Sequence, residues 1–250
     1  MRIEEVKKPL RGELAVPGDK SIGHRAVIFA GIARGVSRIA GLSGGEDNLR
    51  TVRAFEQLGV RIREQEKALH VEGKGWEGLS PAPEVIDCGN SGTTMRLLSG
   101  VLAGLPFVTT LDGDASLRTR PMARVIEPLT QMGAQIVSQN GKGVAPLRIQ
   151  GGKLRAIHYR MPMASAQVKS AIFLAGLQAS GTTVLEEPQQ SRNHTEIMAR
   201  SFGAKVKVEG GRSISLDGPQ QLSARDVQVP GDLSSAAFFL VAAASVPDSE

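Results

Sequence analysis

An internal repeat constrains the fold of this chain more than any other feature of its sequence. Loops of small polar residues begin at Ser21, Asn90 and Ser165. Each loop leads into a wholly apolar segment, and an amphipathic segment that closes at a glycine follows further on. Because both markers recur in the same order at a spacing of roughly 70 residues, each repeat corresponds to a whole supersecondary unit and not to one turn of a solenoid.

The repeat predicts matching elements in the three units. The apolar segments predict buried helices, because they present no polar face to water; they cover 25–33, 94–103 and 168–179. The amphipathic segments predict surface helices over 48–58, 120–132 and 194–202, which begin near Asp47, at Arg120-Pro121 and near Asn193. Strands are predicted after these helices, over 60–63, 134–138 and 204–208.

Three such units predict an α/β fold in which the units share a bundle of buried helices. A single irregular α/β domain with coincidental spacing is the alternative. A fourth loop, 229–236, repeats the Pro-Gly-Asp of residues 17–19 and leads into another apolar segment over 236–244. An apolar helix that no following sheet covers would expose apolar surface to water, so we expect this sequence to be the N-terminal part of a longer protein. Residues 2–16 would then be a strand-bearing piece of its second domain.

The first loop carries the strongest chemical signal. Lys20 and Ser21 follow a Pro-Gly turn at the start of a helix, and Arg25 lies on the same face four residues after Ser21. A helix N-terminus already offers free N–H groups and partial positive charge, so the added cations make an anion receptor suited to phosphate or carboxylate. An ordinary capped core helix with two surface charges is the alternative interpretation of this stretch alone.

The later loops add polar donors and further cations. Their candidate ligand residues are Asn90, Ser91, Thr93, Arg120, Ser165, Gln167, Lys169 and Arg192. Glycines at 89 and 92 let a ligand approach the backbone. We interpret Cys88 as a packing residue, since no histidine stands near it in sequence, and His194 as a hydrogen bonder at a helix start. The set predicts one or two small substrates that carry phosphates and carboxylates.

Composition and missing motifs exclude other classes. The formal net charge is +5, but lysines and arginines are scattered without interleaved aromatics, which argues against nucleic acid as the main partner. One cysteine and four dispersed histidines give neither a disulfide framework nor zinc spacing. A signal core, a run of transmembrane length, a Walker loop and a Rossmann glycine motif are all missing. We therefore expect a cytoplasmic protein that uses neither a membrane, ATP nor NAD.

Six motifs together resemble the 5-enolpyruvylshikimate-3-phosphate synthase family. They are PGDKSIGHRA, GNSGTTMR, GDASLRTRPMARVIEPL, MPMASAQVKSAIFLAGL, SRNHTEIM and VPGDLSSAAFFL, in the family's order across nearly the whole chain. Ser165-Ala166-Gln167 is similar to the glyphosate-tolerant bacterial branch. The resemblance implies the enolpyruvyl transferase fold, with two domains of three βαβαββ units and an active site between them. Residues 19–227 would form one complete domain, and 1–18 with 228–250 the beginning of the other.

The resemblance also implies an activity: transfer of the enolpyruvyl group of phosphoenolpyruvate to the 5-hydroxyl of shikimate 3-phosphate, with release of phosphate. This is a step of chorismate and aromatic amino acid biosynthesis, without cofactor or metal, in an enzyme expected to be a monomer when complete. Lys20 is implied as the catalytic residue. The residues implied for shikimate 3-phosphate are Lys20, Ser21, Arg25, Ser165, Ala166, Gln167 and Arg192. Those implied for phosphoenolpyruvate are Lys20, Gly92, Arg120 and Gln167, with Asn90 and Thr93 shaping the loop.

Two features qualify these expectations. Gly23 stands where the family more often has serine, for which we expect a modest effect. The family's acidic base toward the 5-hydroxyl lies beyond the stretch that matches, so we expect this chain alone to bind shikimate 3-phosphate weakly and to turn over little. Space beside Gly92 predicts that glyphosate fits the assembled enzyme and that Gly92→Ala weakens it.

Three alternatives remain open. A UDP-N-acetylglucosamine enolpyruvyl transferase would carry a cysteine in the cationic loop, and residues 113–122 have none. A binding or structural domain without catalysis would explain the interrupted fourth unit. An RNA 3′-phosphate cyclase-like protein is disfavoured, because its nucleotide-handling signature is missing.

Overall fold

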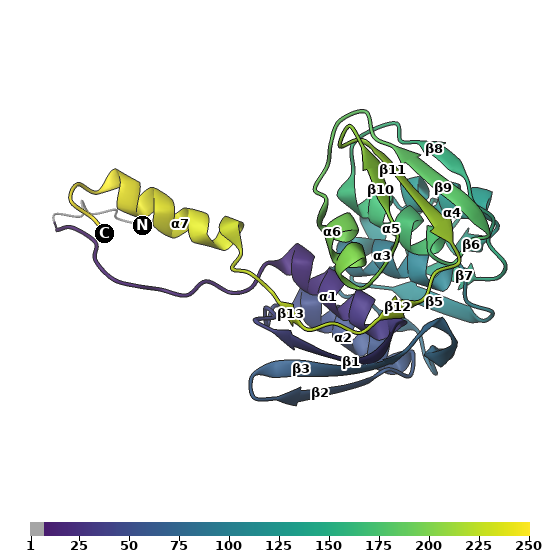
Figure 1. The fold of residues 1–250 in the computed structure, drawn as a ribbon, viewed down its shortest axis with the longest axis horizontal. Coiled ribbons are helices and arrows are strands. Elements are labelled where there is room, and N and C mark those ends of the chain that lie inside the picture. The colour runs from purple at the N-terminus through teal and green to yellow at the C-terminus, as the bar shows by residue number, and fades with distance from the viewer. Residues whose placement is uncertain (1–7) are drawn as a thin grey trace.

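The computed structural model describes residues 8–250, and its main body is built around three buried helices (Figure 1). These are α1 (Lys20–Ile32), α3 (Gly92–Leu102) and α5 (Ala166–Gly176). In each case the residue before the helix caps it, because a side-chain oxygen of Asp19, Ser91 or Ser165 accepts from a backbone N–H three residues on. The helices therefore begin earlier than the apolar segments predict, since the apolar pattern reports only their buried part.

The second and third units each carry a mixed sheet of the same order. In the second, β4 (Ile86–Asp87) pairs in parallel with β5 (Val108–Asp112), followed by β7 (Leu147–Gln150) and β6 (Gln135–Ser138). In the third, β8 (His158–Arg160) pairs in parallel with β9 (Gly181–Glu186), followed by β11 (Ser213–Gly218) and β10 (Lys207–Glu209). Each unit is thus strand, buried helix, strand, surface helix and two strands.

The first unit takes its leading strand from the far end of the chain. Its own strands are β1 (Ala33–Ala40), β2 (Arg61–Gln65) and β3 (Ala68–Lys74). The place beside β1 is filled by β12 (Leu222–Ser223) and β13 (Val227–Gln228), both parallel to it. Ala33 stands opposite Leu222, and Ile39 opposite Val227. Residues that follow the third unit therefore close the sheet of the first.

The surface helices are α2 (Glu46–Gln57), α4 (Ala123–Met132) and α6 (His194–Ser201). Two predicted starts are wrong. Gly45 precedes α2, so Asp47 is its second residue. The helix α4 begins after Arg120-Pro121, because that dipeptide is held in a connecting turn. The 3₁₀ turn η2 (Leu117–Thr119) precedes it, and the Met122 N–H after it donates to the Gly143 carbonyl at 2.8 Å. A second 3₁₀ turn, η1 (Trp76–Gly78), follows β3.

The buried helices touch one another closely, which fixes where their first residues lie. A side chain at Gly100 of α3 would stand 2.2 Å from the carbonyl oxygen of Ala171 on α5, so only glycine permits this contact. The rings of Phe29 on α1 and Phe202, next to α6, lie with centroids 5.8 Å apart in the core. The starts of the three helices are thereby set by dense packing at a distance from them.

The segment 229–250 leaves the main body and carries α7 (Leu233–Ser245), which projects to one side in Figure 1. Its apolar side chains are exposed, Phe238 by 79%. Residues 8–17 run beside it without a regular strand, whereas the sequence predicts a strand within 2–16; residues 2–7 of that range lie outside the described residues. The division into a domain of 19–227 and the two pieces 1–18 and 228–250 stays a prediction. Among residues 8–250, no helix combines the length and apolarity needed to cross a membrane.

Candidate active site

The starts of four helices meet at one cavity of about 410 Å³. Its walls come from equivalent places in successive units: the first two residues of α1 and α3, the second residue of α5 and of α7, and residues at or before the starts of the surface helices. The lining residues are Asp19, Lys20, Ser21, Asp47, Gly92, Thr93, Arg120, Gln167, Arg192, Asp232 and Ser234. The repeat thus directs several helix dipoles and free N–H groups at one point, an arrangement that favours anions.

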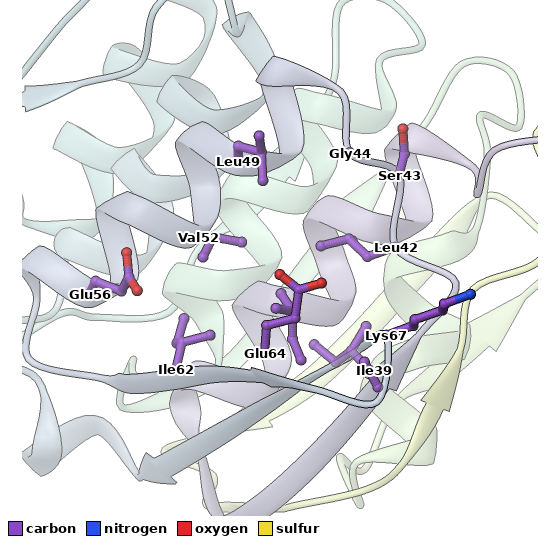
Figure 2. Close-up of a pocket in the computed structure, with 12 residues that line it drawn as sticks. Ile39, Leu42, Ser43, Gly44, Leu49, Val52, Glu56, Ile62, Glu64 and Lys67 are labelled. Carbon is purple, nitrogen blue, oxygen red and sulfur yellow. The ribbon is translucent and has the colours of Figure 1, made fainter.

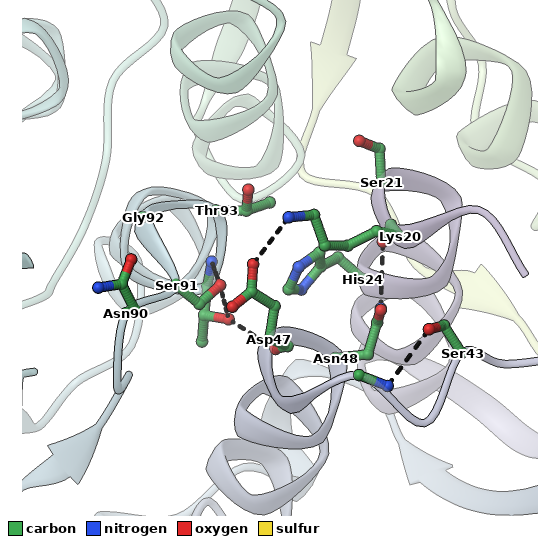
Figure 3. A network of polar contacts seen from close by, with 12 residues as sticks. Lys20, Ser21, His24, Ser43, Asp47, Asn48, Asn90, Ser91, Gly92 and Thr93 are labelled. Carbon is green, nitrogen blue, oxygen red and sulfur yellow. Dashed lines mark hydrogen bonds and ion pairs between the residues drawn. The ribbon is translucent and has the colours of Figure 1, made fainter. Parts of the chain in front are cut away.

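Lys20 projects from the first residue of α1 into this cavity (Figure 3). Its Nζ donates to Asp47 Oδ2 at 3.0 Å, and its side chain is 56% exposed. The backbone near both residues is held as well, since Asn48 Nδ2 donates to the Lys20 carbonyl at 3.1 Å and the Thr94 hydroxyl to the Asp47 carbonyl at 3.3 Å. Sequence reasoning treated Asp47 only as a helix start. Asp47 stands near the start of a surface helix, as Arg120 and Arg192 do, and this shared position could have indicated it as a site residue.

A second cation, Arg120, is held by the loop before α3. Its Nη2 donates to Asn90 Oδ1 at 2.5 Å, and Asn90 Nδ2 donates to Asp114 Oδ2 at 2.9 Å. Asn90 therefore orients Arg120 toward the cavity beside Gly92. Arg118, from the same turn, pairs with Asp112 at 2.9 Å outside the cavity.

Gln167 is fixed from both sides of its amide. Its Oε1 accepts from Arg96 Nη1 at 2.7 Å, and its Nε2 donates to Thr93 Oγ1 at 2.8 Å. Burial lowers the pKa of Arg96, and the nearby Arg120 and Arg124 lower it further. Sequence reasoning did not select Arg96 as a site residue. It lies four residues after Gly92, as Arg25 lies after Ser21, and that recurrence was the signal.

The sequence predicts that Arg25 binds an anion together with Lys20 and Ser21. In the structure Arg25 does not line the cavity but is buried beneath it with 3% exposure. Its Nε donates to Thr195 Oγ1 at 2.7 Å, its Nη2 to Ser170 Oγ at 2.7 Å and its Nη1 to the Ser21 carbonyl at 2.8 Å. Burial, and then the nearby Arg192, lower the pKa of Arg25 to about 10. The two hydroxyl partners come from α5 and α6, so the one-face pattern within α1 could not indicate them.

Arg192 supplies the third cation of the lining. Its Nη1 donates to Ser21 Oγ at 3.1 Å, which joins the segment before α6 to the start of α1. Of the residues 165–167, Gln167 lines the cavity, whereas Ser165 caps α5 and Ala166 is its first residue. His194 is the first residue of α6, and burial lowers its pKa.

Two further features lie near the cavity and do not line it. Cys88 is fully buried, and burial raises the pKa of its thiol, as suits a packing residue. His24 lies beneath Lys20 (Figure 3). Its Nδ1 pairs with Thr51 Oγ1 at 2.7 Å, and Thr51 Oγ1 pairs with Thr94 Oγ1 at 2.8 Å. Burial lowers the pKa of His24 to about 4, so it is neutral and links α1, α2 and α3 through hydroxyl groups.

Another cavity, of about 280 Å³, lies between α2 and the first sheet (Figure 2). Its walls are mainly apolar, with Ile39, Leu42 and Ile62 among them, and the carboxylates Glu56 and Glu64 stand at its rim. Lys67 is the one cation among the described residues of this lining, against two carboxylates, so this cavity is less suited to an anion than the one lined by Lys20, Arg120 and Arg192. Within residues 8–250, His, Cys, Asp and Glu side chains do not gather into a group that could hold a metal ion.

Comparisons with known proteins agree over nearly the whole chain. The model of the family described as EPSP synthase (3-phosphoshikimate 1-carboxyvinyltransferase) matches residues 5–249. The 3-phosphoshikimate 1-carboxyvinyltransferase of Citrifermentans bemidjiense is 53% identical over 97% of this chain and 56% of its own length. That of Streptococcus pyogenes serotype M49 is 51% identical over 100% of this chain and 58% of its own length.

A solved structure gives the same result. The EPSP synthase of Acinetobacter baumannii superposes with a TM-score of 0.91 at 47% identity, over 96% of this chain and 54% of that one. The chain therefore spans little more than half the length of the relatives it matches. The α/β fold and the family expected from the motifs are confirmed, and the chain belongs to the EPSP synthase (3-phosphoshikimate 1-carboxyvinyltransferase) family.

Proposed function

We propose that this chain supplies the anion-binding side of an EPSP synthase active site. In the proposed reaction the enolpyruvyl group of phosphoenolpyruvate passes to the 5-hydroxyl of shikimate 3-phosphate, and phosphate leaves. The observation that carries the proposal is the cavity in which Lys20, Arg120 and Arg192 meet the starts of four helices. Fixed cations and free N–H groups at one point suit substrates that bear both phosphate and carboxylate.

The two sides of the cavity suggest a place for each substrate. Ser21 and Arg192, which bond to each other, would hold shikimate 3-phosphate, and Arg120 beside Gly92 would hold phosphoenolpyruvate. Lys20 lines the same cavity, so we assign it contact with both substrates and a part in proton transfer. Arg25 would act from beneath, through the carbonyl of Ser21.

Further groups of the reaction belong to the same proposal. The acidic base toward the 5-hydroxyl would come from the stretch of the relatives that this chain does not match. On this view the chain binds shikimate 3-phosphate by itself but turns over little. The absence of a cofactor, a cytoplasmic location and a monomeric complete enzyme stay predictions.

Calorimetry with the purified chain tests the proposal. We expect heat on titration with shikimate 3-phosphate, and a loss of affinity on the order of 100-fold in Lys20→Ala, because a charge-assisted contact worth roughly 3 kcal/mol is removed. Arg118→Ala is the matched control, because Arg118 pairs with Asp112 outside the cavity. This variant should bind shikimate 3-phosphate as the unmodified chain does.

The alternative functions give different outcomes in the same experiment. Binding of UDP-N-acetylglucosamine in place of shikimate 3-phosphate would support the related transferase. A chain that gives heat with neither acceptor contradicts the proposed function. Turnover by this chain at the rate of a full-length relative contradicts the dependence on further groups.

A further inference from the structure

A buried group of charges joins α5 to α6, and Gln167 of α5 and Arg192, just before α6, line the cavity. Lys169 Nζ is 2.8 Å from Glu187 Oε2 and 2.8 Å from Glu196 Oε1, and the three side chains are exposed by only 1%, 0% and 4%. Within the described residues, the second oxygen of each carboxylate has no hydrogen-bond partner. Burying charges costs desolvation free energy, so such a group as a whole adds little to the stability of the fold. Removing one partner of a buried ion pair is strongly destabilising, because it leaves the other charge unpaired.

One of the two carboxylates belongs to a double link between α5 and α6. Lys169 pairs with Glu196, and the neighbouring residues Ser170 and Thr195 pair through their hydroxyls at 2.6 Å. The same two hydroxyls accept from the guanidinium of Arg25, at 2.7 Å each. The ion pair and the hydroxyl pair together fix how α6 is placed against α5 and against Arg25.

The position of α6 in turn sets two contacts at the cavity. Arg192, just before α6, donates to Ser21 Oγ, and Arg25, held by Thr195 of α6, donates to the Ser21 carbonyl. A displacement of α6 would move both contacts at once. Glu187 differs from Glu196 here, because it follows β9, and among the bonds of the described residues Arg25 reaches Thr195, Ser170 and Ser21 but no neighbour of Glu187.

We propose that Glu196 is a positioning residue of the anion site: by pairing with buried Lys169 it fixes α6, and thereby holds Arg25 and Arg192 at Ser21. This inference rests on the proposed function for the identity of the anion. Glu196 does not act on α3 or Arg120 through these contacts. Affinity for phosphoenolpyruvate, which we place beside Arg120, should therefore not depend on Glu196.

The two carboxylates provide a matched pair of variants. Glu196→Gln and Glu187→Gln each remove one of two carboxylates at the same distance from the same ammonium and leave it the other. We expect Glu196→Gln to weaken shikimate 3-phosphate at least tenfold by calorimetry, and Glu187→Gln to stay within threefold of the unmodified chain. Equal losses in both variants overturn the proposal, since a merely structural role makes no distinction between them.

A measurement without substrate separates this inference from the proposed function. The Arg25 Nε proton is buried against Thr195, so its exchange with water can be followed by NMR. Glu196→Gln should accelerate that exchange at least tenfold and Glu187→Gln should not, even if the unmodified chain gives no heat with shikimate 3-phosphate. If Glu196→Gln does not fold, Glu196→Asp takes its place, and a folded Glu196→Asp with unchanged Arg25 exchange overturns the inference.

Discussion

At the scale of single residues, Gly92 lies close to two arginines, Arg96 and Arg120. A Cβ at this position would stand 2.7 Å from Arg96 Nη1 and 3.4 Å from Arg120 Nη1. The nearer atom is the end of a flexible side chain, which can move, but it holds Gln167 at 2.7 Å. The absence of a side chain at residue 92 therefore preserves the Arg96–Gln167 bond as well as room for a ligand.

We expect Gly92→Ala to leave stability within about 1 kcal/mol of the original, because its helical backbone accepts alanine. The added methyl group should displace Arg96 and fill the space beside Arg120, so glyphosate should bind less well to the assembled enzyme, by tenfold or more. Inhibition assays and thermal unfolding of the same variant check both parts. An unchanged inhibition constant would contradict the placement of Gly92 beside the ligand.

The structure also explains why residue 23 is a glycine, which the sequence did not indicate. A Cβ there would lie 2.6 Å from Asn48 Nδ2 and 2.8 Å from Leu42 Cδ1. Asn48 uses that nitrogen to bond the Lys20 carbonyl. The glycine at residue 23 thus makes room for Asn48 beneath Lys20.

At the scale of elements, the hydrogen-bonded path from His24 through Thr51 to Thr94 joins α1, α2 and α3. Burial lowers the pKa of His24 from 6.5 to about 4, so the folded chain keeps this ring neutral. Above pH 6.5 neither the folded nor the unfolded state binds the proton, and His24 has no effect on stability. Between pH 6.5 and 4 only the unfolded state binds it, so stability falls with falling pH.

This linkage predicts a loss of about 3 kcal/mol of unfolding free energy between pH 6.5 and pH 4, at about 1.4 kcal/mol per pH unit. His24→Gln, which keeps a hydrogen-bonding group toward Thr51, should lose that part of the pH dependence. Urea unfolding at pH 7.5 and pH 5 should show about 2 kcal/mol of this loss, with His70→Gln on β3 as the control. If His24→Gln and the unmodified chain lose equal stability at pH 5, the assignment to His24 is wrong.

The elements also show what a sequence can and cannot indicate. The buried helices were predictable, because an apolar run records burial locally. The start of α4 was not, since the bond from Met122 to Gly143 joins residues from different segments. Likewise Lys20, Arg120 and Arg192 were chosen from local charge at helix starts, and the structure brings them to one cavity. Their roles toward substrates stay predictions.

Residues whose partners lie in another unit escaped sequence reasoning. Arg25 is bonded by Thr195 and Ser170, which are far away in the chain, and its burial follows from how the units pack. Arg96 is an ordinary charged residue until α5 of the next unit brings Gln167 to it. Contacts of this kind depend on the rotation of one unit against the next, which no local pattern records.

At the scale of the whole molecule, β12 and β13 make the three units a closed set. A chain shortened to end at Gln221 loses both strands, and with them Leu222 and Val229, which are 2% and 3% exposed. Loss of two buried aliphatic side chains and of the pairing along β1 should cost more than about 4 kcal/mol, a large part of a domain's stability.

A chain shortened to end at Asp232 is the control, because it keeps β12, β13 and Val229 and lacks only α7 and the residues after it. We expect its thermal unfolding to resemble that of the full chain, whereas the shorter chain should be largely unfolded at 37 °C. Circular dichroism against temperature distinguishes the two. Equal melting of both shortened chains would show that closure of the first sheet contributes little.

The paired crossing between the main body and α7 has a mechanical consequence. Asp19 N–H donates to the Pro230 carbonyl at 2.8 Å, and Asp232 N–H donates to the Pro17 carbonyl at 2.9 Å. Two backbones tied in this way bend together about a single hinge. Asp19 and Asp232 also cap α1 and α7, and Lys20 of α1 and Ser234 of α7 both line the cavity. A rotation of α7 about this hinge would therefore change the distance between Lys20 and Ser234, and with it the width of the cavity.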